Sequence, residues 1–249
     1  MSKKFLSAMA FVLCFFLVYP LTAQARTFDL AETDISLNID DTHWYVFTRD
    51  NIENNSELEE LGLSYNDMHD ILYNNKAYVD AIVFYENGEY IEFTVRKTSN
   101  DSIVNLSNYD DDMVLTLAKE LAEKNNVKTY TLYESQYKYI NLDYPSSGMY
   151  LCEYITVVNG ENYTLTFQSP KPYTDVEYNE IKGIVDSVQF DIDPSLKEKK
   201  QSTILGGIAY GAIKGVITGV VAFGISAILV KKKKKKTEQN EADNTNIQP

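Results

Sequence analysis

Val79-Asp-Ala-Ile-Val-Phe-Tyr-Glu86, then Asn87-Gly88, then Glu89-Tyr-Ile-Glu-Phe-Thr-Val-Arg96, is the stretch that decides the fold of this 249-residue chain. Both outer segments are rich in β-branched and aromatic residues, which favours strands. Asn-Gly supplies the positive φ angles of a type I′ turn, so the pattern predicts a β-hairpin with a two-residue loop. Such a loop places Glu86 opposite Glu89 and sets the register of the whole hairpin.

The predicted register divides this hairpin into two faces, because successive side chains of a strand point to opposite sides. The face expected in the core carries Ile82, Phe84, Ile91, Phe93 and Val95. The face expected to be at least partly exposed carries Tyr85, Tyr90, Glu92, Thr94 and Arg96.

A second hairpin with the same turn chemistry is expected further along the chain. Tyr150 to Val158 and Glu161 to Gln168 flank Asn159-Gly160. The predicted register gives one face the residues Cys152, Tyr154, Tyr163, Leu165 and Phe167. Cys152 is therefore expected to be a small buried residue rather than a nucleophile, since no histidine lies near it in the sequence to activate it.

Two further pairs of strands are expected around these hairpins. Val127 to Tyr133 and Tyr137 to Tyr144 alternate well enough to extend the second hairpin into a meander. Near the start, Ile35 to Ile39 and His43 to Phe47 read as a strand pair across Asp40-Asp41. The tyrosines of the meander allow either a recognition patch or ordinary half-buried sheet positions.

Three helices are predicted from their capping residues. They start at Ser64-Tyr-Asn-Asp67, near Asn108 and Asp110-Asp-Asp112, and at Thr174-Asp-Val-Glu177. Their expected core-facing residues are Met68, Ile71, Leu72, Met113, Leu117, Leu121, Tyr178, Ile181, Ile184 and Val188. Short strands and helices in this order predict an α+β domain, in which helices cover an antiparallel sheet.

The two ends of the chain carry its longest apolar segments. Residues 1–25 combine a basic start, a short apolar run and an Ala-x-Ala site, which predicts a signal peptide cleaved after Ala25. An uncleaved signal anchor is the alternative. Residues 204–230 are apolar and long enough for one transmembrane helix. An interfacial helix is the alternative there, but the segment has no charged face.

Residues 231–249 are expected to form a basic, disordered, cytoplasmic tail. The tail begins with the lysines Lys231, Lys232, Lys233, Lys234, Lys235 and Lys236. By the positive-inside rule this block holds the C-terminus in the cytoplasm, against anionic membrane lipid. The predicted location is therefore the cell membrane, with a single span and with residues 26–200 as a large extracytoplasmic domain.

A glycine repeat marks one side of the predicted membrane helix. Its members are Gly207, Gly211, Gly215 and Gly219. Small residues at every fourth position let two helices approach closely, and Lys214 and Thr218 lie at the margin of this groove. The pattern indicates self-association, with a different membrane protein as the alternative partner. Glycine is also simply common in membrane helices.

The charge of the domain excludes some classes of partner. Between Arg26 and Thr203 the chain has 14 Lys and Arg against 33 Asp and Glu, a net charge of −19. Such a surface should repel nucleic acid and other anionic polymers. A Ca²⁺-responsive domain is the alternative function that this charge suggests, beside the plainer explanation of a well-solvated surface. After cleavage only Cys152 remains, so no internal disulfide is expected.

No arrangement of residues predicts catalysis, so no catalytic residue, metal ligand or cofactor is expected. Asp110-Asp111-Asp112 is better explained by helix capping than by Ca²⁺ binding, because the acids are consecutive rather than spaced to converge on an ion. His43 and His69 have no evident catalytic partner, and structural or surface roles are expected for both. An enzyme of an unrecognised class is the further alternative.

The order of these elements resembles a known family. An early strand pair with Trp44, followed by helix, hairpin, helix, meander and final helix over residues 28–192, is similar to the PsbP-like fold. With its glycine-rich C-terminal segment the chain also resembles a family of uncharacterised membrane-anchored surface proteins of low-GC Gram-positive bacteria. The resemblance implies a non-enzymatic binding or assembly module. Its expected partners are membrane lipid, a second copy of the chain, or an unknown surface protein or envelope component.

Overall fold

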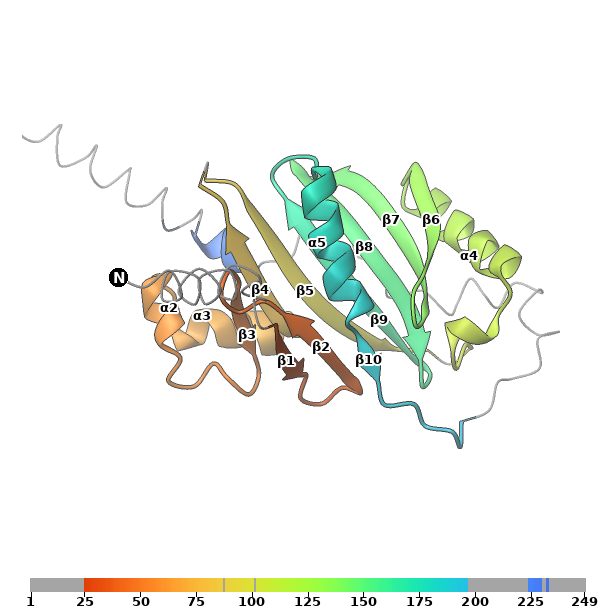
Figure 1. Cartoon of the computed structure of the whole chain (residues 1–249), viewed down its shortest axis with the longest axis horizontal. Helices are drawn as coiled ribbons and strands as arrows, with labels where there is room; N and C mark the ends of the chain where they lie inside the picture. The colour runs from red at the N-terminus through yellow and green to blue at the C-terminus, as the bar shows by residue number, and fades with distance from the viewer. Residues whose placement is uncertain (1–24, 87, 101, 197–223, 230–231, 233–249) are drawn as a thin grey trace, which may run out of the picture.

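A seven-stranded sheet forms the centre of the computed structural model, which describes residues 25–86, 88–100, 102–196, 224–229 and 232 (Figure 1). The strand order is β3-β4-β5-β9-β8-β7-β6, and every neighbouring pair is antiparallel. The strands are β3 (Tyr45–Thr48), β4 (Ala77–Phe84), β5 (Tyr90–Ser99), β6 (Thr129–Glu134), β7 (Lys138–Ser146), β8 (Met149–Val158) and β9 (Glu161–Ser169). The predicted α+β class and the meander from β6 to β9 are confirmed.

The β8–β9 hairpin has the predicted turn and register. Val158 pairs with Glu161, and the two residues between them, Asn159 and Gly160, have φ angles of 54° and 73°. These positive angles are those that a type I′ turn requires. Cys152 faces the core and is fully buried, as predicted.

The β4–β5 hairpin differs from its prediction by one residue. Phe84 pairs with Tyr90, and the backbone N–H of Tyr85 donates to the carbonyl of Glu89, so that three residues rather than two lie between the last hydrogen-bonded residues of the hairpin. Gly88 takes the left-handed conformation that closes this longer loop, with a φ angle of 79°. The Asn-Gly pair therefore marks the turn correctly but not its length.

This one-residue shift changes which side chains share a face, because the side-chain period of a strand is two. Ile82 pairs with Glu92 and lies on the opposite side of the sheet from Phe93. The apolar face of the hairpin carries Val79, Ala81, Val83, Ile91, Phe93 and Val95. Grouping Ile82 and Phe84 with the apolar residues of β5 was therefore wrong.

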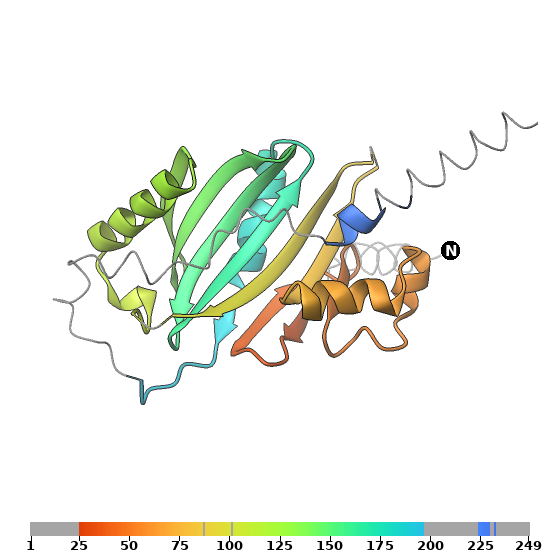
Figure 2. The same ribbon diagram turned by 180° about the vertical axis from the view of Figure 1, so that it is seen from behind.

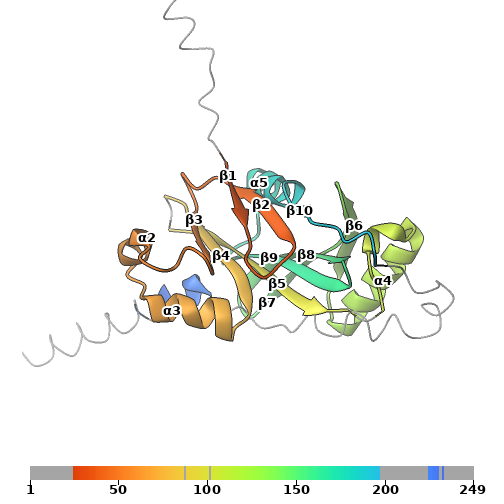
Figure 3. The ribbon, with the colours of Figure 1, turned by 90° about the horizontal axis from the view of Figure 1, so that it is seen from below.

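Helix α5 and a small second sheet cover this apolar face (Figures 1 and 3). Helix α5 spans Asp175–Asp186, and the small sheet has the order β1-β2-β10. Its strands are β1 (Arg26–Asp29), β2 (Ile35–Ile39) and β10 (Gln189–Phe190). Figure 3 shows these elements as a layer on one side of the central sheet and α3 and α4 on the other.

The strand pair predicted near the start of the chain is wrong. Strand β2 pairs with β1 and β10, whereas β3 pairs with β4 in the central sheet. The chain turns between β2 and β3 at Asp40, whose carbonyl accepts hydrogen bonds from the N–H groups of His43 and Trp44. Trp44 is buried, and its Nε1 donates to Glu180 Oε1 of α5 at 2.7 Å, which ties the start of β3 to that helix.

The other face of the central sheet is covered by helices at its two ends (Figure 2). Helix α4 (Asp111–Lys124) packs on β6 and β7, and α2 (Ser56–Glu60) and α3 (Tyr65–His69) pack at the β3–β4 end. Helix α3 continues as a π-helical turn, η1 (Asp70–Asn74), and η2 (Leu106–Asn108) is a 3-10 turn before α4.

The three predicted helix starts are confirmed by their caps. Ser64 and Asp67 form a capping box at α3, and Thr174 and Glu177 form another at α5. Asp110 Oδ1 accepts from the N–H of Met113 at 2.8 Å, which is the capping role predicted for the acidic run. Helix α2 and strands β1 and β10 had no counterpart among the predicted elements.

Most of the residues predicted to act in the membrane lie outside the described residues. These are residues 1–24 of the signal peptide, Gly207, Gly211, Lys214, Gly215, Thr218 and Gly219 of the membrane helix, and Lys231, Lys233, Lys234, Lys235 and Lys236 of the tail. Within the part of the chain that the structure describes, no helix has the length and apolar character needed to cross a bilayer.

Two glycine substitutions should have opposite effects on stability. Gly160→Ala should destabilise the domain by about 1 kcal/mol, because a residue with a Cβ is disfavoured at its φ of 73°. Gly183→Ala should stabilise it by up to about 1 kcal/mol, because this glycine lies inside α5 and an added Cβ meets no atom within 4 Å. Urea denaturation measures both changes, and a loss of stability from Gly183→Ala would contradict the assigned helix.

Candidate functional site

A continuous group of polar side chains lies on the face of the central sheet opposite α5, and we call it the polar strip. Its members are Asp80, Glu92, Thr94, Arg96, Glu153, Thr164, Thr166 and Gln168. Four of them form one ladder across four adjacent strands, in the order Asp80, Thr94, Thr166 and Glu153. Seven of the eight are buried, and Arg96 is half-buried. Apolar clusters beneath α3 and α4 flank the strip on its two sides.

Two buried carboxyl groups dominate the electrostatics of this strip. Burial raises the pKa of both Asp80 and Glu92, and for Asp80 the charge of the neighbouring Glu92 raises it further. Two carboxylates in contact repel each other when both are ionised, so their contact and their burial both favour a proton on the pair. Burial lowers the pKa of Arg96, against the attraction of the surrounding carboxyls.

Several polar atoms of the strip are unsatisfied within the part of the chain that the structure describes. Among the described residues, Thr94 Oγ1, Arg96 Nε and Gln168 Oε1 are buried and have no hydrogen-bond partner. Buried polar atoms are normally satisfied, so unsatisfied ones on one surface indicate a place where another group binds. The signal in the sequence was the run of alternate polar residues in β5, which was expected on a partly exposed face, and the matching run in β9, from which no prediction was made.

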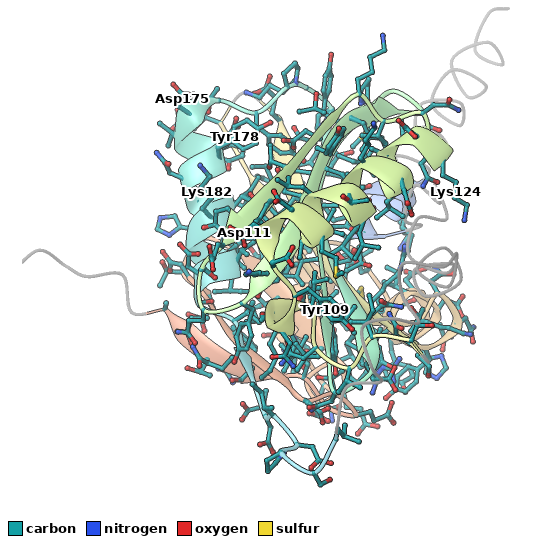
Figure 4. The ribbon with its side chains drawn as sticks, turned by 90° about the vertical axis from the view of Figure 1, so that its right-hand side faces the viewer. Tyr109, Asp111, Lys124, Asp175, Tyr178 and Lys182 are labelled. Atoms are coloured by element: carbon teal, nitrogen blue, oxygen red, sulfur yellow. The ribbon has the colours of Figure 1, made fainter. Side chains whose placement is uncertain are left out.

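A cleft of about 550 Å³ lies on the other face, between α5 and strands β6 and β7. Its lining residues, which define the α5 cleft, are Thr131, Tyr133, Asn141, Asp143, Tyr154, Asp175, Tyr178, Asn179 and Lys182. Figure 4 shows Asp175, Tyr178 and Lys182 following one another along α5. The cleft offers aromatic rings, amides, carboxyl groups and one ammonium group, which is the chemistry of a binding site.

Asp143 is a partly buried carboxyl group of the α5 cleft. Burial raises its pKa, although hydrogen bonds from Cys152 and Tyr178 favour its charged form. Burial also raises the pKa of Cys152 well above its usual value, so the thiol stays protonated. Asn141 Nδ2 donates to Cys152 Sγ at 3.4 Å and to Glu153 O at 3.2 Å. The thiol is thus a packed side chain, which agrees with its predicted role.

The two histidines lie apart from both sites. His43 Nδ1 is 2.9 Å from Asp40 Oδ2 at an exposed turn. His69 stacks on Tyr73, with ring centroids 4.6 Å apart. Neither contact sets up a nucleophile.

The acidic run at the start of α4 also makes an ion pair. Next to the capping residue Asp110, Asp111 Oδ1 lies 2.6 Å from Lys138 Nζ (Figure 4 labels Asp111).

A second hollow of about 540 Å³, beside β1 and β2, is lined by acidic residues. They are Asp29, Glu32, Asp34, Asp50 and Asp191. Nowhere in the described residues do three or more Asp, Glu, His or Cys side chains come together as metal ligands.

Lys232 is the one residue of the predicted topology block that the structure describes. Its Nζ donates to Gly62 O at 2.7 Å and to Asp67 Oδ2 at 2.8 Å. Hydrogen bonds from Lys232 and Ser64 outweigh the effect of burial and lower the pKa of Asp67. The sequence analysis placed Lys232 in a cytoplasmic tail and Asp67 in an extracytoplasmic domain, whereas this structure brings the two side chains into contact.

The comparisons with known proteins identify a distant structural likeness. No family model matches the chain, and no curated protein matches its sequence. A solution structure of cyanobacterial PsbP from Synechocystis sp. PCC 6803 is similar to it, with a TM-score of 0.39 and 10% sequence identity over 70% of this chain and 95% of that chain. The structural neighbour is thus of the kind that the resemblance in sequence named. At this distance it carries no property of that protein over to this chain.

The polar strip should make the stability of the domain depend on pH through Glu153. Burial raises the pKa of Glu153 from 4.5 to about 7. Below pH 4.5 this group is protonated in both states; as the pH rises to 7 the unfolded chain releases its proton first, so the wild type loses stability. The change amounts to about 3 kcal/mol. Glu153→Gln removes it, and urea denaturation of both proteins across this pH range measures the growing difference.

The control for this prediction is Glu134→Gln, since Glu134 is exposed at the end of β6. Its difference from the wild type should stay constant with pH. A constant difference for Glu153→Gln as well would show that Glu153 does not titrate in the folded domain as its burial implies.

Proposed function

We propose that this chain is a non-enzymatic, membrane-anchored surface protein whose extracytoplasmic domain is a binding module. Residues 1–25 direct export, residues 204–230 anchor the chain in the cell membrane, and the domain between them binds an envelope component or another surface protein. The observation that carries this proposal is the α5 cleft, an open site rich in binding groups and without an activated nucleophile among the described residues.

The shape and lining of the α5 cleft suit a small polar ligand with an apolar face. Tyr133 and Tyr178 are partly exposed there, and Asn179 and Lys182 are exposed on the lip formed by α5. Tyrosine rings pack against apolar faces while amide and charged groups fix orientation by hydrogen bonds. The Tyr133 hydroxyl is itself held by a hydrogen bond to Asp186 Oδ1 at 2.6 Å, so one wall of the cleft is already ordered.

Photocrosslinking in native membranes tests this site. A benzophenone amino acid in place of Asn179, at the lip of the cleft, should give a specific adduct with the bound component in the full-length protein. The same group in place of Lys128, which is exposed before β6 and away from the cleft, is the control and should give none. Tyr178→Ala should remove the adduct by taking away the aromatic wall.

Equal adducts at the two positions, or an adduct unchanged by Tyr178→Ala, would place binding elsewhere. Mass spectrometry of the adduct then distinguishes a glycan or other envelope component from a protein partner.

We further propose that the glycine face of residues 204–230 holds two copies of the chain together. Gly207, Gly211, Gly215 and Gly219 recur every four residues in the sequence, the spacing at which helix backbones approach closely in lipid. Replacing Gly211 and Gly215 by Leu should therefore abolish a dimer detected by quantitative crosslinking in membranes. Replacing Val220 and Val221, which are outside the repeat, by Leu is the control. A monomer in the wild type would rule out this part of the proposal.

A further inference from the structure

The segment 224–229 binds one end of the polar strip by hydrogen bonds. The backbone N–H of Ile225 donates to Asp80 Oδ2 at 3.3 Å, and that of Ser226 donates to Glu92 Oε1 at 3.2 Å. The Ser226 hydroxyl donates to Glu92 Oε2 at 2.5 Å. Because the helical turn begins at Ile225, these amides have no acceptor within it. The unpaired amides and the buried carboxyl pair therefore satisfy each other.

Apolar packing and close approach reinforce these hydrogen bonds. Ile225 is fully buried in the cluster beneath α3, and Ile228 and Leu229 pack against the same cluster. A Cβ at Gly224 would overlap the carboxyl group of Glu92, so any larger residue there would force that carboxyl out of its present position. Figure 2 shows this helical turn beside β4 and β5.

An ion pair holds the far end of the same segment. Lys232 reaches Asp67 at the start of α3, at 2.8 Å. Hydrogen bonds to the strip, burial of Ile225 and this ion pair lie at successive positions along one short stretch of chain. Three kinds of contact along one short segment are typical of a bound ligand, here one that belongs to the same chain.

We propose that segment 224–229, together with Lys232, is an intramolecular ligand of the polar strip, so that the chain has a docked form in which the domain holds the end of its own predicted membrane helix. A helix spanning residues 204–230 would separate Lys232 from Asp67 by the thickness of the bilayer, about 30 Å. The docked and spanning forms therefore exclude each other. In the docked form the domain covers this apolar segment, which prevents its association with other proteins before it inserts into a membrane.

A thiol crosslink between the strip and the segment tests the docked form. Gln168 Nε2 and Ser226 Oγ are 3.5 Å apart, and the thiols of Gln168→Cys and Ser226→Cys end closer to their own backbones than these atoms do. A short bis-methanethiosulfonate reagent, which forms a disulfide to each thiol, should therefore join the two positions within one chain. The full-length protein is synthesised in a cell-free system without membranes, with Cys14→Ser and Cys152→Ala to remove its own thiols. Ser226→Cys paired with Asn179→Cys, on the opposite face of the sheet, is the control pair and should not link.

A matched pair of glycine variants shows whether the contact at Gly224 is specific. Gly224→Ala should lower the yield of the crosslink about tenfold, because its Cβ would overlap the carboxyl of Glu92. Gly183→Ala adds the same methyl group where no atom lies within 4 Å and should leave the yield unchanged. Absence of the crosslink in a chain whose domain resists protease would overturn the proposal, and so would a crosslink that joins two chains.

Adding lipid vesicles during synthesis separates this proposal from the proposed membrane anchor. Loss of the crosslink in chains that become resistant to alkaline extraction would support two competing positions for the segment. A crosslink that persists in such chains would support docking and overturn the span at residues 204–230.

Discussion

The register between β4 and β5 is the constraint that separates the polar strip from the apolar core beneath α5. It sends Val79 and Phe93 toward α5 and sends Asp80 and Glu92 to the opposite side of the sheet. A shift by one residue would turn one strand over relative to the other and place either Asp80 or Glu92 beneath α5, in a cluster made of apolar side chains. The three-residue loop that ends in Gly88 fixes this register, so a local backbone choice decides the chemistry of both faces.

The polar strip lowers the free energy of unfolding of the domain. Buried carboxyl groups without full compensation are costly, and Asp80, Glu92 and Glu153 all have pKa values raised by burial. The apolar clusters beneath α3 and α4 lie on either side of the strip. The hydrophobic stabilisation from these clusters offsets the free-energy cost of the buried carboxyl groups. A sheet face that is apolar at both ends and polar in the middle is suited to hold a partner in its centre.

Local signals in the sequence predicted the parts of the fold that local chemistry determines. The capping boxes at Ser64 and Thr174 gave the starts of α3 and α5, and Asn159-Gly160 gave a turn and register that hold residue by residue. The same dipeptide at Asn87-Gly88 gave a wrong loop length, because the hydrogen bond from Tyr85 to Glu89 depends on the neighbouring strands and not on the dipeptide.

Parts of the structure built from distant segments could not be predicted in this way. Strand β10 is two residues long and exists because it pairs with β2, and the α5 cleft combines side chains from three strands and a helix. Neither has a periodic pattern or a motif of its own. Most helices and strands could therefore be predicted from the sequence, whereas the surfaces that they form together could not.

The backbone amides of residues 225 and 226 have different hydrogen-bond acceptors in the two forms proposed for the segment. In a continuous helix across a bilayer, the N–H groups of Ile225 and Ser226 must bond to carbonyls four residues earlier, because lipid offers no other acceptor. In the docked form the same two N–H groups donate to Asp80 and Glu92. One amide hydrogen does not serve both acceptors well, so the helix has to break near Gly224 for the segment to bind the strip. In this proposal the carboxyl pair competes with the carbonyls of the proposed membrane helix for the same two amides.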